Sequence, residues 1–110
     1  MTQTRQLAAI MFTDIVGYTS LMGKNSQKAM ELLHHSKELQ KPLVEKYNGK
    51  WIKETGDGVL AQFGSALDAV NCAIEIQKGT KTAGFEAELR IGIHLGDITL
   101  EDGDVYGNGV

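Results

Sequence analysis

The order of strand-like and helix-like segments is the feature that most limits what this chain can fold into. Residues 6–12 form a largely apolar run that predicts a buried strand, and residues 26–47 place apolar side chains at helical spacing. The next two runs, KWIKET (residues 50–55) and VLAQF (residues 59–63), are short and rich in β-forming side chains. Because a Gly-Asp-Gly turn separates these two runs, they predict a hairpin that carries an acid at its tip.

A second helix and a last strand complete the order. Ser65 begins the helix with the capping pattern Ser65-x-x-Asp68, and Gly79 is expected to end it. In ELRIGIHLGDITL (residues 88–100), apolar and polar side chains alternate as in a strand. The buried stripe of the second helix is expected to comprise Ala66, Ala69, Val70, Ala73 and Ile74, with Cys72 and Ile76 beside it. The order strand, helix, strand, strand, helix, strand predicts an α+β fold of ferredoxin-like type, in which two helices cover an antiparallel sheet.

Two features are expected to interrupt or end the first helix. Pro42 lies inside the apolar pattern, where its missing N–H and its ring should kink the helix or split it. The pair Asn48-Gly49 is a good C-terminal stop. We therefore expect the helix to be bent or broken at Pro42 and to end at Asn48-Gly49.

The composition excludes several classes of protein. The chain has 110 residues, 42% of them hydrophobic, and a formal net charge of −3, which fits one globular unit without a basic footprint for nucleic acid. No run approaches the roughly 18 apolar residues of a membrane span, so we expect no membrane insertion by this segment. A single cysteine, Cys72, excludes an internal disulfide and fits a reducing, cytoplasmic location.

Asp14 interrupts the apolar stretch IMFTDIVGYTSLM (residues 10–22), where an uncompensated carboxylate costs on the order of several kcal/mol. In the predicted topology the end of the first strand and the hairpin turn can be neighbours, so Asp14 and Asp57 can converge. Two carboxylates at such a junction repel each other unless a divalent cation lies between them, and oxygen ligands suit Mg²⁺ or Mn²⁺. Aspartate is also common in turns for conformational reasons, so the spacing leaves open both a metal pair and two ordinary turn residues.

The segment VGYTS, shortly after Asp14, is a candidate phosphate-binding site, although this pattern is weak evidence by itself. Gly17, Tyr18 and Thr19 lie where a helix can begin, and free backbone N–H groups at a helix start attract phosphate. The chain contains neither the G-x-x-x-x-G-K-[ST] loop nor a G-x-G-x-x-G turn after a strand. A nucleotide bound here is therefore not bound by either of those loops.

Four segments, taken in order, resemble a known family. FTDIVGYT, KETGDG, RIGIHLGDI and DVYGNGV are similar to successive motifs of class III nucleotidyl cyclase catalytic domains. The resemblance extends from about Leu7 to Val110 and implies that residues 1–110 form part of one such domain. In the family motif an Asn follows GNGV and an Arg lies four residues beyond it, and both contact the reacting nucleotide. The resemblance therefore implies little or no turnover by these 110 residues alone.

The resemblance also assigns the chemistry to named residues. Asp14 and Asp57 match the two catalytic carboxylates that bind two divalent ions, Mg²⁺ or Mn²⁺, and the backbone carbonyl of Ile15 is implied as a further ligand. One ion would activate the ribose 3′-hydroxyl for attack on the α-phosphorus, and the other would hold the triphosphate. The amides of VGYTS would then cradle the phosphates, and pyrophosphate would leave.

Two further positions are implied to read the base. Lys53 matches a position held by Lys in adenylyl-type members and by Glu in guanylyl-type members. Asp104 matches a second position, which is typically Asp or Thr for adenine and Cys for guanine. A lysine can donate to adenine N1 and a carboxylate can accept from the N6 amino group, whereas guanine reverses both polarities. The implied substrate is therefore ATP and the implied product is cyclic AMP.

The family resemblance implies a head-to-tail homodimer as well. Members of the family place their sites at the interface, where the metal aspartates of one subunit face the base-reading residues of the other. Two-fold symmetry would give two equivalent sites, and a monomer should be inactive.

Two other functions stay open at this point. A non-catalytic cyclase homology domain, which dimerises or senses nucleotide, would share the fold, although the presence of all four polar site residues argues against it. A diguanylate cyclase or another palm-type phosphotransfer enzyme would carry a Gly-Gly-acidic hairpin, which this chain lacks. An adenylyl cyclase catalytic domain is therefore the function that the sequence favours.

Overall fold

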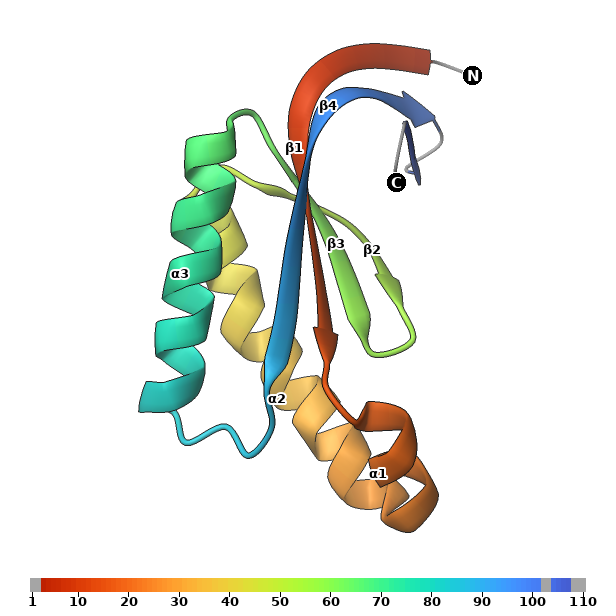
Figure 1. Cartoon of the computed structure of the whole chain (residues 1–110), viewed down its shortest axis with the longest axis vertical. Coiled ribbons are helices and arrows are strands. Elements are labelled where there is room, and N and C mark those ends of the chain that lie inside the picture. The colour runs from red at the N-terminus through yellow and green to blue at the C-terminus, as the bar shows by residue number, and fades with distance from the viewer. Residues whose placement is uncertain (1–2, 102–103, 108–110) are drawn as a thin grey trace.

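The fold is an α+β arrangement in which helices cover one face of an antiparallel sheet (Figure 1). The computed structural model describes the backbone of residues 3–101 and 104–107 and the side chains of residues 8–96. Its elements, in chain order, are β1 (Gln3–Ile15), α1 (Tyr18–Lys24), α2 (Ser26–Lys46), β2 (Lys50–Thr55), β3 (Gly58–Phe63), α3 (Ala66–Thr82), β4 (Leu89–Glu101) and β5 (Asp104–Gly107).

β1 lies in the middle of the sheet. Over the described residues the strand order is β2-β3-β1-β4-β5, and all neighbouring strands are antiparallel. The first four of these strands have the ferredoxin-like order, so the predicted fold class is confirmed. β1 is longer than the predicted residues 6–12 because β4 pairs with it along its whole length, from Gln3 opposite Glu101 to Ile15 opposite Leu89.

Alternating side chains of β1 pack on the two faces of the sheet. On the helix-covered face, Ala9 and Met11 are fully buried in a cluster that includes Ala61, Phe63, Val44, Ala69, Cys72 and Ile76. On the other face, Ala8 and Ile10 are buried against Phe12, Ile52 and Leu60. A fully buried Met or Ile side chain contributes roughly 1.5–3 kcal/mol, so the strand that leads to the site is fixed from both sides.

The first long helix, α2, is not split at Pro42. Asn25 caps its start, because the Asn25 side chain accepts a hydrogen bond from the Lys28 amide (3.1 Å). Pro42 lies on the exposed side of the helix, so water can solvate the carbonyl that loses its N–H partner and the helix continues to Lys46. The helix ends just before Asn48, which has a left-handed φ of 59°, as the stop signal predicted.

The second long helix, α3, begins as predicted and ends later. The Ser65 side chain accepts a hydrogen bond from the Asp68 amide (3.1 Å), which confirms the cap. The prediction that Gly79 ends the helix is wrong, because Gly79 lies inside α3 with Leu39 of α2 packed against it. Gly84, two residues beyond the end of the helix, is the glycine that has a left-handed backbone at this helix end (φ 67°).

The buried face of α3 differs in part from the predicted stripe. The fully buried side chains are Ala69, Cys72, Ile76 and Thr80. By contrast, Val70 and Ile74 are 43% and 46% exposed, so their predicted burial is wrong. Val70 follows the buried Ala69 and Ile74 lies midway between Cys72 and Ile76, so both lie off the line of buried positions, which recur every three or four residues.

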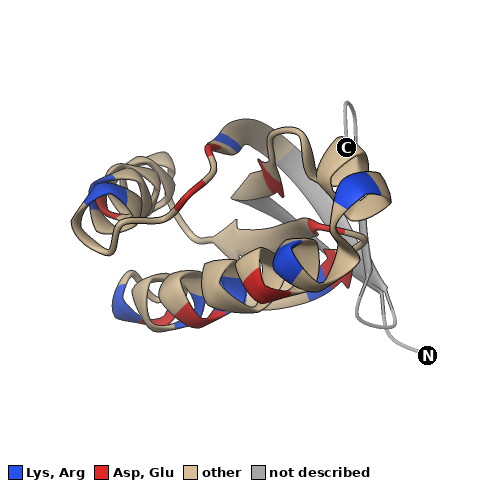
Figure 2. Cartoon of the chain, turned by 90° about the horizontal axis from the view of Figure 1, so that it is seen from below, with Lys and Arg blue, Asp and Glu red and all other residues tan. Residues whose placement is uncertain are grey.

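Charge is mixed over the described surface. Figure 2 shows Lys and Arg interspersed with Asp and Glu along the helices. None of the described helices has the length and apolar character needed to cross a membrane.

Candidate functional site

The metal and phosphate residues predicted from the sequence line one pocket where β1 ends. This pocket has a volume of about 350 Å³. Its lining consists of Asp14, Ile15, Gly17, Tyr18, Thr19, Ser20, Asp57 and Arg90. The predicted metal ligands Asp14, Ile15 and Asp57 are in this set with Gly17, Tyr18, Thr19 and Ser20 of the VGYTS segment, and Arg90 is a lining residue that was not predicted.

The end of β1 is shaped by a sharp turn into α1. The Val16 amide donates to the Glu88 carbonyl oxygen (2.9 Å), which keeps β1 beside the start of β4 for one more residue. Gly17 then adopts a left-handed φ of 77°, a conformation that glycine takes without steric cost, and it precedes the first residue of α1. The turn therefore places the first residues of α1, whose backbone N–H groups have no partner within the helix, in the lining of the pocket.

Asp57 reaches the same pocket through the hairpin between β2 and β3. β3 pairs with β1 up to Val59 opposite Thr13, so the hairpin turn lies beside the end of β1. The Asp57 Oδ2 accepts a hydrogen bond from the Ile15 backbone N–H (2.8 Å). At Gly58, a Cβ atom would lie 2.9 Å from the Thr13 carbonyl oxygen, so a side chain would force the turn away from β1. Glycine at this position permits the close approach that brings the two predicted acids together.

Asp14 is bound by an arginine that sequence reasoning missed. Arg90 is directly opposite Asp14 in the β1–β4 register. Its Nε donates to Asp14 Oδ1 (2.9 Å) and its Nη2 donates to Asp14 Oδ2 (3.1 Å). The hydrogen bond and charge of Asp14 raise the pKa of Arg90, and the charge of Asp57 adds to the effect. The alternation in RIGIHLG indicates that Arg90 is on the polar face of its strand. It does not show that Arg90 lies beside Asp14, because that depends on the register between β1 and β4, which the sequence does not specify.

A buried polar network supports the strand just before Asp14. The Thr13 hydroxyl donates to Gln40 Oε1 (2.9 Å), and Gln40 Nε2 donates to the Ser36 hydroxyl oxygen (2.8 Å). All three side chains are at least 97% buried. Each such bond contributes about 1 kcal/mol net, while a broken one leaves a costly unpaired group. The network therefore fixes the end of β1 against α2.

Of the two predicted base-reading residues, Lys53 is described with its side chain, and it is not in the lining of this pocket. Lys53 is exposed on β2, opposite Leu60, and a β-bulge precedes it at Ile52. Leu60 in turn lies opposite Phe12, two residues before Asp14, so Lys53 and Asp14 share the sheet face that the helices leave uncovered. Asp104 is paired with Glu101 through the backbone of β5, and its side chain lies outside the described part of the structure.

The donor set of the pocket fits a hard divalent cation. Within the described residues, no three His, Cys, Asp or Glu side chains gather at one point. Mg²⁺ is commonly held by one or two carboxylates together with water and substrate phosphates, whereas structural zinc needs a closed set of four ligands. The Asp14 and Asp57 pair therefore suits Mg²⁺ or Mn²⁺ that binds together with a phosphate-bearing ligand.

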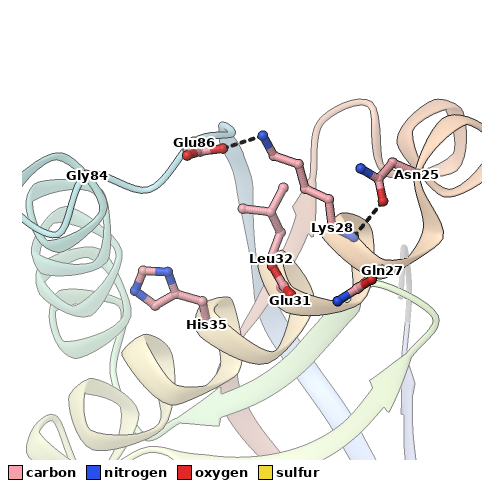
Figure 3. A pocket seen from close by; sticks show the side chains of 8 residues that line it. All are labelled: Asn25, Gln27, Lys28, Glu31, Leu32, His35, Gly84 and Glu86. Carbon is pink, nitrogen blue, oxygen red and sulfur yellow. Dashed lines mark hydrogen bonds and ion pairs between the residues drawn. The ribbon is translucent and has the colours of Figure 1, made fainter.

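A larger hollow of about 500 Å³ lies between the start of α2 and the segment before β4 (Figure 3). Lys28 and Glu86 form an ion pair across it, with Nζ and Oε2 2.6 Å apart. Glu31 and His35 complete a lining of mixed charge. Since its one lysine is already paired with a glutamate, this hollow offers an anion no excess of positive charge.

Comparison with known proteins places these features in one family. Residues 1–105 match the family described as "Adenylate and Guanylate cyclase catalytic domain". The chain is 43% identical over 113 residues to "Putative adenylate cyclase 3" of Rhizobium meliloti, a match that covers 96% of this chain and 19% of that protein. It is 31% identical over 103 residues to an adenylate cyclase of Streptomyces coelicolor, which covers 93% of this chain and 27% of that protein. The chain thus spans about a quarter or less of these curated relatives.

Among solved structures, the chain is similar to an "Adenylate/Guanylate Cyclase/Hydrolase" from Silicibacter pomeroyi. The two superpose with a TM-score of 0.87 at 38% sequence identity. The superposition covers 97% of this chain and 66% of the other.

Proposed function

Since this chain belongs to the adenylate and guanylate cyclase catalytic domain family, we propose that it contributes to an adenylyl cyclase that converts ATP to cyclic AMP and pyrophosphate. The observation that carries the proposal is that Asp14, Ile15 and Asp57 line one pocket beside the turn at Gly17. The adenylate cyclase names of the two curated relatives support ATP as the substrate. The activity is proposed for a protein that contains the whole cyclase domain, including the Asn and Arg of the family motif.

In this proposal Asp14, Asp57 and the backbone carbonyl of Ile15 hold two divalent ions, Mg²⁺ or Mn²⁺. When bound, the ions supply positive charge that favours ionisation of the ribose 3′-hydroxyl and offsets the charge of the triphosphate. The free amides at the start of α1 bind phosphate oxygens, and the helix dipole favours negative charge there. The chain itself therefore contributes positioning and charge stabilisation.

The proposal includes a head-to-tail homodimer. Lys53 and Asp104 are assigned to the adenine base, yet Lys53 does not line the pocket that contains Asp14 and Asp57. In a two-fold dimer each subunit can present its Lys53 to the pocket of the other, which accounts for this separation. A monomer then lacks a complete site.

Replacement of Asp57 tests the proposal. In a protein that carries this chain within the complete cyclase domain, Asp57→Ala removes one of two carboxylate ligands. We expect the formation of cyclic AMP from ATP with Mn²⁺ or Mg²⁺ to fall by at least about 100-fold. The measurement is the initial rate of cyclic AMP production at saturating ATP and metal.

Asp68→Asn is a matched control, because Asp68 lies in the first turn of α3 and not in the pocket. This variant should keep the activity of the unaltered protein. Full activity of Asp57→Ala would contradict the metal assignment. Failure of the unaltered protein to form cyclic AMP would instead favour a non-catalytic homology domain.

A further inference from the structure

We propose that Arg90 is the counter-ion of Asp14 in the metal-free protein and competes with the divalent ion for this carboxylate. The inference rests on the proposed function, because it takes Asp14 and Asp57 as the metal ligands. It adds Arg90 as a residue that affects the affinity of the metal site for a divalent ion.

Arg90 and Asp14 form a bidentate pair. Arg90 binds Asp14 side-on, with Nε 2.9 Å from Oδ1 and Nη2 3.1 Å from Oδ2. Both oxygens of Asp14 are thus engaged by one planar cation. A metal ion that approaches either oxygen meets a guanidinium that is already hydrogen-bonded to that oxygen.

Without metal, the charged side chains of the pocket lining carry a net negative formal charge. Asp14 and Asp57 line the same pocket, and two carboxylates in one site repel each other. Among the described residues of the pocket lining, Arg90 is the one basic side chain. The formal charge of the three side chains is −1, against −2 for the two carboxylates alone, and this reduction stabilises the empty site and also weakens its attraction for a divalent ion.

The contact between Arg90 and Asp14 is easily broken. The Arg90 side chain is 72% exposed and that of Asp14 is 40% exposed. Exposed ion pairs are weak because water solvates the separated charges. Arg90 can therefore swing into solvent when a metal ion binds, so the pair tunes the affinity of the site without blocking it.

Metal affinity can be measured on the chain without nucleotide or turnover. Titration with Mn²⁺, followed by the electron paramagnetic resonance signal of the free ion, gives a dissociation constant for each variant. We expect Arg90→Gln to bind Mn²⁺ about two- to tenfold more tightly than the unaltered chain. Arg90→Lys keeps the charge but cannot make the side-on pair, so its affinity should lie between these two.

Lys24→Gln is the control for net charge. It removes one positive charge from the last turn of α1, whereas the described contacts of Asp14 are with Arg90. Its affinity should change less than that of Arg90→Gln, since exposed charges beyond direct contact are screened by salt. Circular dichroism of each variant shows whether the fold is retained.

A second measurement reports on Arg90 directly. The Arg90 Nε–H resonance, identified by its loss in Arg90→Lys, should move during titration with diamagnetic Mg²⁺. It should not move in Asp14→Asn, where the partner carboxylate is absent.

The outcomes separate this inference from the proposed function. If Asp14→Asn weakens Mn²⁺ binding while Arg90→Gln leaves it unchanged or weaker, the metal pair stands and the role of Arg90 is wrong. If neither the unaltered chain nor Arg90→Gln binds Mn²⁺, either alone or with a non-hydrolysable ATP analogue, the metal pair itself is wrong and the inference fails with it. An Arg90 resonance that does not respond to bound Mg²⁺ would also overturn the competition.

Discussion

Asp14 and Arg90 are 76 positions apart in the chain and face each other where β1 ends and β4 begins. At the scale of single residues, Asp14 and Asp57 could be selected from the sequence because each ends an apolar or β-prone run and both belong to recognisable motifs. Arg90 could not be selected in this way, since its importance depends on strand register. Lys53 and Asp104 differ from both cases. Their roles in reading the base are implied by the family resemblance alone and stay predictions.

Replacement of both base-reading residues tests those roles. In the complete cyclase domain, we expect Lys53→Glu combined with Asp104→Cys to shift the ratio of kcat/KM for ATP and GTP toward GTP. The reason is that glutamate accepts from the N1 and N2 groups of guanine, whereas lysine donates to adenine N1. One lost or misplaced base contact is worth about 1–3 kcal/mol, so a shift of at least about tenfold is expected.

Lys50→Glu supplies the comparison for this variant, because Lys50 is an exposed lysine of the same strand. It reverses the same charge without occupying the assigned base position. An unchanged ratio of ATP to GTP in the double variant would reject the roles of Lys53 and Asp104.

At the scale of elements, short-range sequence patterns predicted where helices and strands begin better than where they end. The Ser65 cap and the hairpin around Asp57 follow from short-range patterns, and both are present in the structure. Pro42 and Gly79 did not break their helices, because tertiary surroundings decided the outcome. Pro42 faces water, and Gly79 is an ordinary helix position beside Leu39.

Two glycine substitutions distinguish a helix interior from a helix end. We expect Gly84→Ala to lower the free energy of unfolding by about 1 kcal/mol, because Gly84 has a φ of 67° that alanine adopts only with strain. Gly79→Ala should instead raise it by up to about 1 kcal/mol through better helix propensity. An added Cβ at Gly79 would lie 3.4 Å from Leu39 Cδ2, an ordinary contact distance. The measurement is urea unfolding followed by circular dichroism.

The opposite signs make this pair informative. Destabilisation by Gly79→Ala together with tolerance of Gly84→Ala would mean that α3 ends at Gly79 after all.

At the scale of the whole molecule, the sheet places distant motifs at one end. Asp14 at the end of β1, Asp57 in the β2–β3 hairpin and Arg90 of β4 line the same pocket. β3 pairs with β1 on one side and β4 pairs with it on the other. The fold class was predictable because the segment order allows few sheet topologies. Burial was less predictable, since apolar character does not show which side chains another element will cover, and Val70 and Ile74 are exposed on α3.

The central claim is that this arrangement forms the divalent-metal site of a cyclase catalytic domain. Its most direct test is a crystal of the chain soaked with Mn²⁺ and a non-hydrolysable ATP analogue, with anomalous diffraction used to locate the metal. The account predicts anomalous density within coordination distance of carboxylate oxygens of both Asp14 and Asp57, with the Arg90 side chain moved off Asp14. Full occupancy of Mn²⁺ on the nucleotide with no density at either aspartate would contradict it.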